Sequence, residues 1–153
     1  MDKFKSTPRL SYKVVSVILT QTDTTVGFLS QDEKQLQTIK SRNSTKPFIK
    51  VYKDFQSLTT RVPNTHKNLI RRSKKTTFII RNRAFRVTQS ILNSSLLNAH
   101  WYFSTSANAA GKNFDRIFCE EKADIIIENK TLLHEERASS LLKINKNTIR
   151  RLR

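Results

Sequence analysis

Two clusters of hydroxyl side chains stand beside the only two glycines of the chain. The first cluster occupies residues 20–25, just before Gly27, and the second occupies residues 104–108, just before Gly111. Serine and threonine often only make turns and helix caps, but their hydroxyls and the asparagine amide can also bind phosphate or carboxylate groups. Glycine allows a close backbone approach because it has no Cβ. We therefore interpret the two clusters as opposite walls of one site for an anionic ligand.

A pair of cations lies between the clusters, at Lys40 and Arg42, and Lys46-Pro47 follows. Two cations at this spacing can converge on one anion, lysine as a point charge and arginine as a bidentate fork. The spacing also arises by chance in a basic chain, so its weight comes from its place between the two clusters.

Apolar patterning predicts the elements that position these groups. We expect strands at residues 14–19, 47–52, 76–80, 100–103 and 124–127 and helices at residues 31–41, 66–72 and 88–99. The last stretch, 141–153, is basic and fits either type of element. Strands that alternate with helices favour an α/β sheet, in which ligands bind outside the carboxyl ends of strands. The length fits one domain over residues 1–153.

Charge limits the partners. The chain holds 29 Lys and Arg against 12 Asp and Glu, and residues 55–114 contain ten of the cations and no acid. Such a stretch attracts a polyanion, either a nucleotide triphosphate or an RNA, although a solvated basic face that serves solubility would have the same composition. No apolar run approaches the roughly 20 residues of a membrane helix. Cys119 is the only cysteine and the three histidines are scattered, so we expect no zinc site and a cytoplasmic location.

In order along the chain, several patches resemble the YrdC-like family of threonylcarbamoyl-AMP synthases. Residues 22–28 resemble the family's P-T-[DE]-T-x-Y-G-L, residues 39–47 its K-x-R…K-P, and residues 85–88 its V-R-V-[PT]. Residues 104–111 are similar to S-T-S-A-N-x-S-G, the most specific of these motifs, and residues 138–141 faintly resemble P-S-[TE]-I.

The resemblance implies a twisted, open, mixed α/β sheet with flanking helices around a basic cavity. It also implies an enzyme that joins L-threonine, bicarbonate and ATP into threonylcarbamoyl-AMP, with Mg²⁺ bound to the ATP and no metal held by the protein itself. A downstream threonylcarbamoyl-transferase complex would pass the group to tRNA. The implied catalytic residues are Lys40, Arg42, Ser106 and Asn108. The implied substrate-binding residues are Thr22, Asp23, Thr24, Arg86, Ser104, Thr105 and Ser139.

The sequence departs from the family's motifs at four places. Gln21 and Ala138 replace prolines, Val26 replaces an aromatic residue, and Ser73-Lys74-Lys75 replaces a Pro-Gly-Pro turn. The last change would either narrow the nucleotide pocket or add lysine contacts to phosphate. The rival hypothesis is a non-catalytic protein that binds double-stranded RNA on the same scaffold. An enzyme needs its four catalytic residues in one pocket, whereas an RNA-binding protein needs only an open basic surface.

Overall fold

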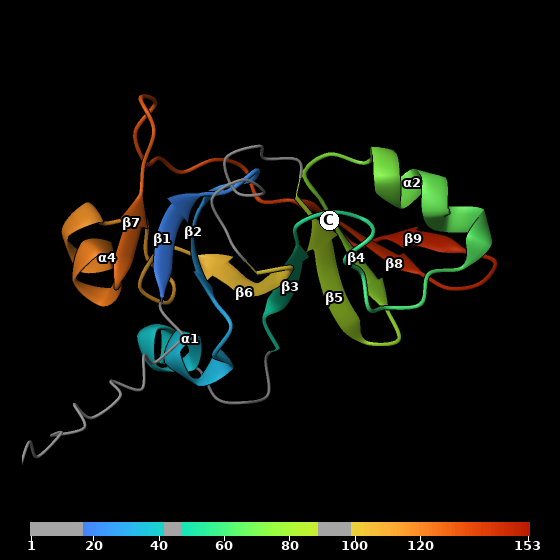
Figure 1. Ribbon diagram of the computed structural model, residues 1–153, viewed down its shortest axis with the longest axis horizontal. Helices are drawn as coiled ribbons and strands as arrows, with labels where there is room; N and C mark the ends of the chain where they lie inside the picture. The colour runs from blue at the N-terminus through green and yellow to red at the C-terminus, as the bar shows by residue number, and fades with distance from the viewer. Residues whose placement is uncertain (1–16, 42–46, 89–98) are drawn as a thin grey trace, which may run out of the picture.

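The computed structural model describes residues 17–41, 47–88 and 99–153. The described residues form nine strands, three α-helices and a 3-10 helix, η1 (Figure 1). In chain order the elements are β1 (Ile18–Gln21), β2 (Val26–Ser30), α1 (Glu33–Lys40), β3 (Ile49–Tyr52), η1 (Asn64–His66), α2 (Lys67–Arg72), β4 (Thr76–Ile80), β5 (Arg83–Val87), β6 (Trp101–Ser106), α4 (Arg116–Lys122), β7 (Ile125–Ile127), β8 (Ser140–Ile144) and β9 (Ile149–Arg151).

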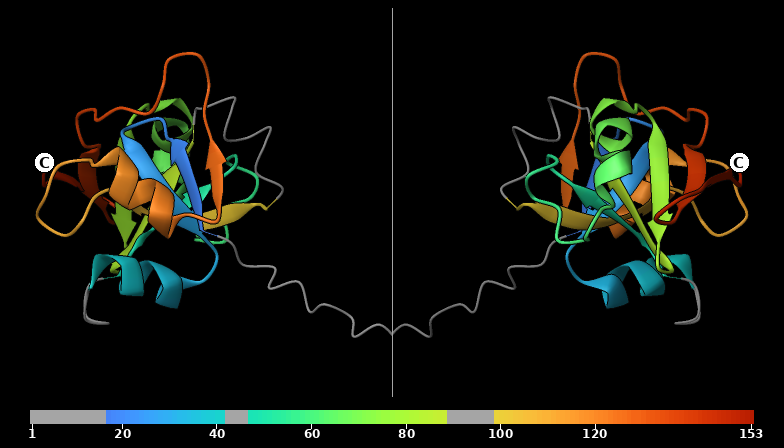
Figure 2. Two further views of the ribbon diagram at one scale, coloured as in Figure 1. Left: turned by 90° about the vertical axis from the view of Figure 1, so that its left-hand side faces the viewer. Right: turned by 90° about the vertical axis from the view of Figure 1, so that its right-hand side faces the viewer.

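All nine strands belong to one sheet, in the order β7-β1-β2-β6-β3-β5-β4-β8-β9. Three neighbouring pairs are parallel, β1 with β7, β3 with β5 and β4 with β8, and the other pairs are antiparallel. The strand direction turns steadily from one end of the sheet to the other (Figures 1 and 2), as the right-handed twist of strands requires. The predicted α/β class with a mixed sheet is confirmed.

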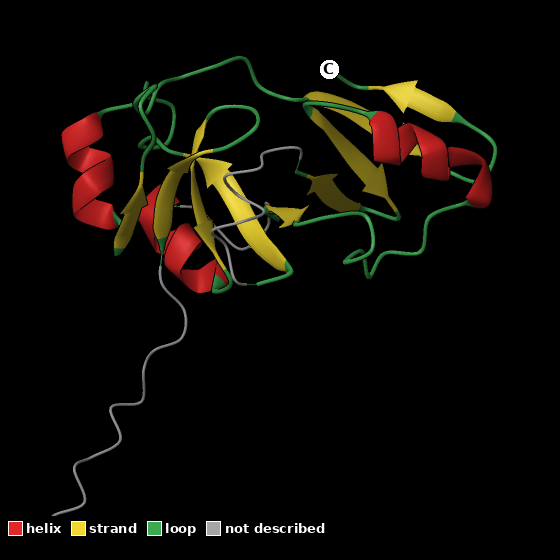
Figure 3. Ribbon diagram, turned by 45° about the horizontal axis from the view of Figure 1, so that its top comes forward, coloured by secondary structure: helices red, strands yellow, loops and turns green. Residues whose placement is uncertain are grey.

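One face of the sheet carries the apolar core. Cross-strand register and the two-residue alternation of a strand place Leu19, Phe28, Phe85 and Phe78 on this face. Leu19 and Phe28 belong to a buried cluster that includes residues of α1 and α4, and the two phenylalanines belong to a second cluster that includes Ile70 of α2. All three helices therefore cover the same face, and Figure 3 shows them beside the strands that they pack on.

The opposite face carries polar side chains at the middle of the sheet. Arg86 lies beside Val51, Val51 lies beside Tyr102, and alternation along β6 puts Ser104 and Ser106 on the same face as Tyr102. A small apolar cluster around Ile18 and Leu29 is also buried on this face. The two larger apolar clusters lie under the helices on the other face, which leaves the polar groups free to contact a ligand.

Most predicted elements are found close to their expected positions. The strand expected at 76–80 is β4, those expected at 47–52, 100–103 and 124–127 are β3, β6 and β7, and the helix expected at 66–72 is η1 followed by α2. The strand expected at 14–19 is β1, shifted toward Gln21. The helix expected at 88–99 falls almost wholly on residues 89–98, outside the described residues.

The first helix begins two residues later than predicted. The sequence predicted a helix over residues 31–41, but Ser30 ends β2 and α1 begins at Glu33. Asp32 is the actual N-cap, since its carboxylate accepts a hydrogen bond from the Lys34 N–H at 3.0 Å.

Four strands and a helix were not predicted from the sequence. β2 and β5 lie within residues that we interpreted only as ligand-binding motifs, and β8 and β9 occupy the ambiguous tail. α4 has a clear start signal at Asp115, whose carboxylate accepts hydrogen bonds from the Ile117 and Phe118 N–H groups. The strand expected to end at Phe103 is also longer than predicted. Residues 104–106 of the second hydroxyl cluster form the last part of β6.

Candidate functional site

The first hydroxyl cluster forms the turn between β1 and β2. The Thr22 hydroxyl donates to the Thr25 carbonyl at 2.6 Å, accepts from the Thr24 N–H at 3.2 Å, and lies 3.1 Å from the Thr24 hydroxyl. The backbone N–H of Thr22 also reaches the Thr25 carbonyl. These bonds hold the turn in one shape and bury the Thr22 and Thr24 side chains.

Gly27 lets this turn and β6 come close together. A Cβ at residue 27 would lie 3.0 Å from the Thr22 methyl carbon and 3.1 Å from the Thr105 carbonyl oxygen. Both contacts are tighter than ordinary van der Waals contact, so a residue with a Cβ would require the turn or β6 to shift by a few tenths of an ångström. Gly27 therefore sets the distance between the two hydroxyl clusters.

Asp23 and Arg86 form a buried ion pair beside the turn. The Arg86 Nε lies 3.2 Å from Asp23 Oδ1, and the two side chains are 5% and 7% exposed. Their atoms do not meet at hydrogen-bond geometry, and both Asp23 oxygens lack a hydrogen-bond partner in the described structure. Burial lowers the pKa of the Arg86 guanidinium, and the Asp23 charge partly opposes that shift.

Ser139, just before β8, and Arg153 form another side of the site. The hydroxyls of Ser139 and Thr77 lie 2.7 Å apart, and both side chains are buried. Arg153 donates from Nε to the Ser139 carbonyl at 3.0 Å. This places a second guanidinium close to the Ser139 hydroxyl, at 3.5 Å from Arg153 Nη2.

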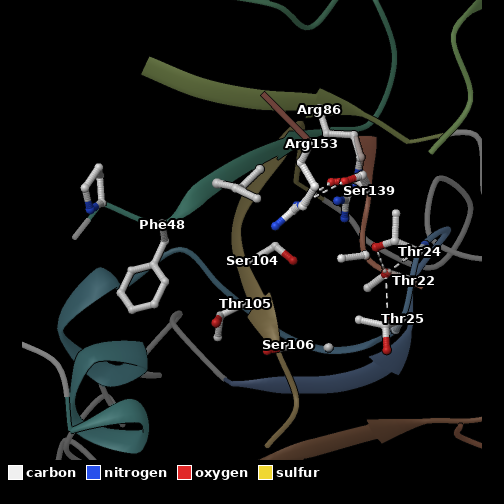
Figure 4. A pocket seen from close by; sticks show the side chains of 14 residues that line it. Thr22, Thr24, Thr25, Phe48, Arg86, Ser104, Thr105, Ser106, Ser139 and Arg153 are labelled. Carbon is white, nitrogen blue, oxygen red and sulfur yellow. Dashed lines mark hydrogen bonds between the residues drawn. The ribbon is translucent and has the colours of Figure 1, made fainter. Parts of the chain in front are cut away.

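These groups line one cavity of about 280 Å³. Figure 4 shows the side chains of Thr22 and Thr24, of Ser104, and of the two arginines, which come from different elements and face the same space. The residues around the cavity are Thr22, Thr24, Thr25, Gly27, Pro47, Phe48, Ile49, Arg86, Ser104, Thr105, Ser106, Ala138, Ser139 and Arg153.

Lys40 is joined to the end of β6. Its ammonium donates to the Ser106 and Asn108 carbonyls at 3.0 and 2.9 Å, and also to the Asn108 side-chain oxygen. The Ser106 hydroxyl in turn donates to the Asn108 side-chain oxygen at 3.0 Å. Lys40 is only 2% exposed and does not line the cavity itself. Its ammonium contacts Ser106, which does line the cavity.

The structure brings together the predicted site residues that it describes, in two groups. Thr22, Thr24, Arg86, Ser139 and residues 104–106 line the cavity directly, and Asp23 lies behind them as the partner of Arg86. Lys40 and Asn108 lie behind Ser106 and do not line the cavity. Arg42 lies outside the described residues.

Sequence reasoning missed two residues of the site. Arg153 lines the cavity but belongs to the tail that we left unassigned, and Thr77, whose hydroxyl lies beside that of Ser139, stands in a strand that carried no motif. Polarity is the one sequence feature that could have pointed to Thr77 and Arg153. Many surface residues are also polar, so this feature does not single them out.

The structure shows what the residues that depart from the family motifs contact. Gln21 accepts a hydrogen bond from the His134 N–H through Oε1, and Val26 is buried in the core. Lys75 forms an exposed ion pair with Glu136 at 3.0 Å. Lys74 and Lys75 do not line the cavity.

Other candidate centres have weak support among the described residues. No group of three His, Cys, Asp or Glu side chains in them could hold a metal ion. The Cys119 thiol is fully buried, and burial raises its pKa, which disfavours the reactive thiolate. Nor is any helix of the described chain both long enough and apolar enough to cross a membrane.

Comparisons with solved structures identify the fold. E. coli YciO matches with a TM-score of 0.74 at 18% identity, over 92% of this chain and 83% of YciO. P. abyssi Sua5, solved in complex with L-threonine, matches with a TM-score of 0.70 at 20% identity, over 90% of this chain and 50% of Sua5. MTH1692 from Methanobacterium thermoautotrophicum matches with a TM-score of 0.66 at 18% identity, over 90% of this chain and 79% of that protein.

These likenesses show a YrdC-like fold, which confirms the fold predicted from the sequence motifs. The chain spans only about half the length of Sua5. No family model matches the sequence, and neither does any curated protein. The deep basic cavity that the motifs imply stays a prediction, since the cavity described above is lined mainly by hydroxyl groups and two arginines.

Proposed function

We propose that this protein is an L-threonylcarbamoyladenylate synthase, which makes threonylcarbamoyl-AMP and pyrophosphate from L-threonine, bicarbonate and ATP. The observation that carries the proposal is the convergence of two hydroxyl clusters and Arg86 on one cavity. The motif resemblance predicted these residues as substrate ligands, and Sua5, which shares the fold, was solved with L-threonine bound.

The turn after β1 suits the amino-acid end of the substrate. Arg86 lines the cavity while its Nε faces Asp23, and its remaining N–H groups can donate to a carboxylate. Thr22 and Thr24 also line this part of the cavity. Their methyl and hydroxyl groups offer a surface for a small polar side chain such as that of threonine. We infer that this wall binds the carboxylate and orients the amino group.

The β6 wall suits the phosphates. Ser104 and Ser106 present hydroxyls to the cavity, and the Lys40 ammonium lies directly behind Ser106. Arg42, two residues after Lys40 in the sequence, is the second cation that the family resemblance implies for the phosphates. Mg²⁺ would enter bound to ATP, because this ion usually keeps several waters and binds substrate phosphates rather than a cage of protein ligands.

The reaction needs positioning more than covalent help from the protein. The threonine amine adds to bicarbonate with loss of water to form a carbamate. A carbamate oxygen then attacks the α-phosphorus of ATP, the bond to the β-phosphate oxygen breaks, and pyrophosphate leaves. Cations and hydroxyls aimed at the phosphates stabilise the charge that develops on the phosphoryl oxygens. The product would serve tRNA modification through a separate transferase, in the cytoplasm.

The test is pyrophosphate release by the purified protein, with L-threonine, bicarbonate and ATP omitted one at a time. We expect release only with all three, a loss of at least about 100-fold in Arg42→Ala and Ser106→Ala, and no change in Thr131→Ala, an exposed hydroxyl that does not line the cavity. Release that needs neither threonine nor bicarbonate contradicts the proposal. No release, with RNA binding intact, favours the non-catalytic RNA-binding protein instead.

A further inference from the structure

The net positive charge of the sequence is concentrated in two segments that form one half of the sheet. Residues 55–88 and 137–153, which include α2, β4, β5, β8 and β9, contain 15 Lys and Arg and no Asp or Glu. The other 14 Lys and Arg are nearly balanced by all 12 acidic residues of the chain. The half at the right of Figure 1 therefore carries almost the whole net charge.

A second cavity lies in this half. It has a volume of about 650 Å³ and is bounded by the segment leading into η1, the β4–β5 turn and the end of β8. The cations around it are Arg61, Arg81, Lys143 and Lys146, and no Asp or Glu of the described chain lines it. Its floor is apolar, formed by Val62, Ile80 and Ile144. The amide side chains around it are Asn64, Asn82, Asn145 and Asn147.

The second cavity and the candidate active site lie at opposite ends of the same strands. Arg86 at the end of β5 and Ser139 before β8 belong to the first cavity, while Arg81 before β5 and Ile144 at the end of β8 belong to the second. The separation along β8 is about 17 Å at roughly 3.3 Å per residue. A ligand in the second cavity would therefore contact different residues from a ligand in the candidate active site.

The rim of the second cavity is built from turns that are tied to one another. Arg81 and Asn82 both have positive φ, at 49° and 63°, as a two-residue hairpin turn requires. The Asn145 side chain caps the turn after β8 by accepting from the Thr148 N–H at 2.7 Å. The His66 ring bonds the Asn145 carbonyl at 2.9 Å and so joins the two sides. The backbone that carries the cations is therefore held in place on both sides of the cavity.

We propose that the second cavity binds a nucleotide unit of a nucleic acid, with the phosphodiester backbone on its cations. A basic surface kept for solubility needs no cavity, and a simple anion site needs no apolar floor. A base and ribose can cover the Ile80 and Ile144 floor while amides such as Asn82 bond the base edge. The surrounding half adds long-range attraction for the rest of the polyanion.

The test is fluorescence anisotropy with a labelled single-stranded RNA, whose unpaired bases can enter the cavity, at several salt concentrations and with the full chain. The double variant Arg81→Gln/Lys143→Gln should bind at least about tenfold more weakly at 0.15 M salt, and the slope of log affinity against log salt should become shallower by about 1.4. The double variant Arg61→Gln/Lys146→Gln should show the same loss of affinity and the same change in slope. The matched control Lys34→Gln/Lys130→Gln removes two exposed cations from the other half and should keep the wild-type slope.

Several outcomes would overturn this inference. They are an unchanged slope in both cavity variants, an equal loss in the control, or binding to vesicles of anionic phospholipid without binding to RNA. Displacement of the RNA by free ATP as effectively as by unlabelled RNA would likewise assign the cavity to a free nucleotide. Circular dichroism of each variant confirms that the exposed substitutions leave the fold intact. Pyrophosphate release should be unchanged in the cavity variants, so this test and that of the proposed function fail separately.

Discussion

At the scale of single residues, the Asp23–Arg86 pair is the buried ion pair of the candidate site. Among the ion pairs of the described residues, it alone has both side chains less than a tenth exposed. Removing both charges from water is costly, and their attraction offsets that cost only while both are present. The pair is therefore poorly suited to stability alone, and it places a guanidinium on the wall of a cavity.

Breaking this pair should destabilise the fold strongly. In Arg86→Met the Asp23 carboxylate stays buried without its partner, and we expect the free energy of unfolding to fall by about 3–5 kcal/mol. The double variant Asp23→Leu/Arg86→Met should recover most of that loss, because no buried charge remains. Urea unfolding measures both values.

Arg83→Met is the matched control for this prediction. Arg83 lies in the same strand as Arg86 but is exposed, so its loss should cost less than about 0.5 kcal/mol. A loss in Arg86→Met no larger than in this control would contradict our description of the pair.

At the scale of elements, Lys40 fastens α1 to the end of β6. The helix ends at Lys40, and the ammonium reaches oxygen atoms of two residues more than 60 positions later. Hydrogen bonds that involve a charged group contribute about 1.5–3 kcal/mol each to stability. Lys40 is thus a positioning residue for Ser106 and Asn108.

Lys40→Met should lower the free energy of unfolding by about 2–3 kcal/mol, because the oxygens of residues 106 and 108 lose their shared donor. The change should also reduce pyrophosphate release, since Ser106 is no longer held in place. Lys34→Met alters an exposed lysine of the same helix and serves as the control for chemical unfolding and for kinetics. Equal effects of the two substitutions would show that Lys40 holds nothing in place.

The segment between β7 and β8 is fastened to the β1–β2 hairpin. The His134 carbonyl accepts from the Val26 N–H, and the Glu136 N–H donates to the Thr25 hydroxyl at 3.1 Å. The Glu136 carboxylate is 3.0 Å from Lys75 Nζ and 2.8 Å from His134 Nε2. This segment leads directly to Ala138 and Ser139 of the cavity wall.

This contact should respond to pH. The Leu132 carbonyl and then Glu136 raise the pKa of His134 above 6.5, so the stabilisation from protonated His134 is complete below pH 6.5 and declines as pH rises through the raised pKa. Lys75 and His134 lower the pKa of Glu136 below 4.5, so its stabilisation is complete above pH 4.5 and declines as pH falls through the lowered pKa. Both contributions are complete between pH 4.5 and 6.5.

A proton NMR titration of the His134 ring measures the coupling. In Glu136→Gln the pKa of His134 should fall toward 6.5 but stay above it, because the Leu132 carbonyl remains. Glu121→Gln, an exposed acid on α4, should leave the titration of His134 unchanged. An unchanged His134 titration in Glu136→Gln would contradict the hydrogen bond between these side chains.

At the scale of the whole molecule, the sequence motifs predicted the class of fold and the sheet's mixed character but not its order. Apolar patterning predicts an element from its own residues, as for β4 and α2. β2 and β5 were missed because Gly27 and Arg86 resemble loop residues, and their burial depends on partners far along the chain. No local pattern encodes such pairings.

The candidate site follows the same division. The motifs predicted Thr22, Arg86 and Ser104 as site residues, and the sheet brings them to one cavity. They did not predict that the Lys40 ammonium is held by carbonyls of residues 106 and 108, nor that Arg153 joins the wall. Both depend on three-dimensional contacts between segments without a shared motif.

The most direct test of the proposed chemistry is mass spectrometry of the product made from ATP, L-threonine and isotopically labelled bicarbonate. The account predicts an adenylate that carries both the threonine and one labelled carbon in the reaction of the wild-type protein, and its loss in Ser106→Ala. A folded wild-type protein that yields no labelled adenylate, or that yields AMP or ADP regardless of threonine and bicarbonate, would contradict it.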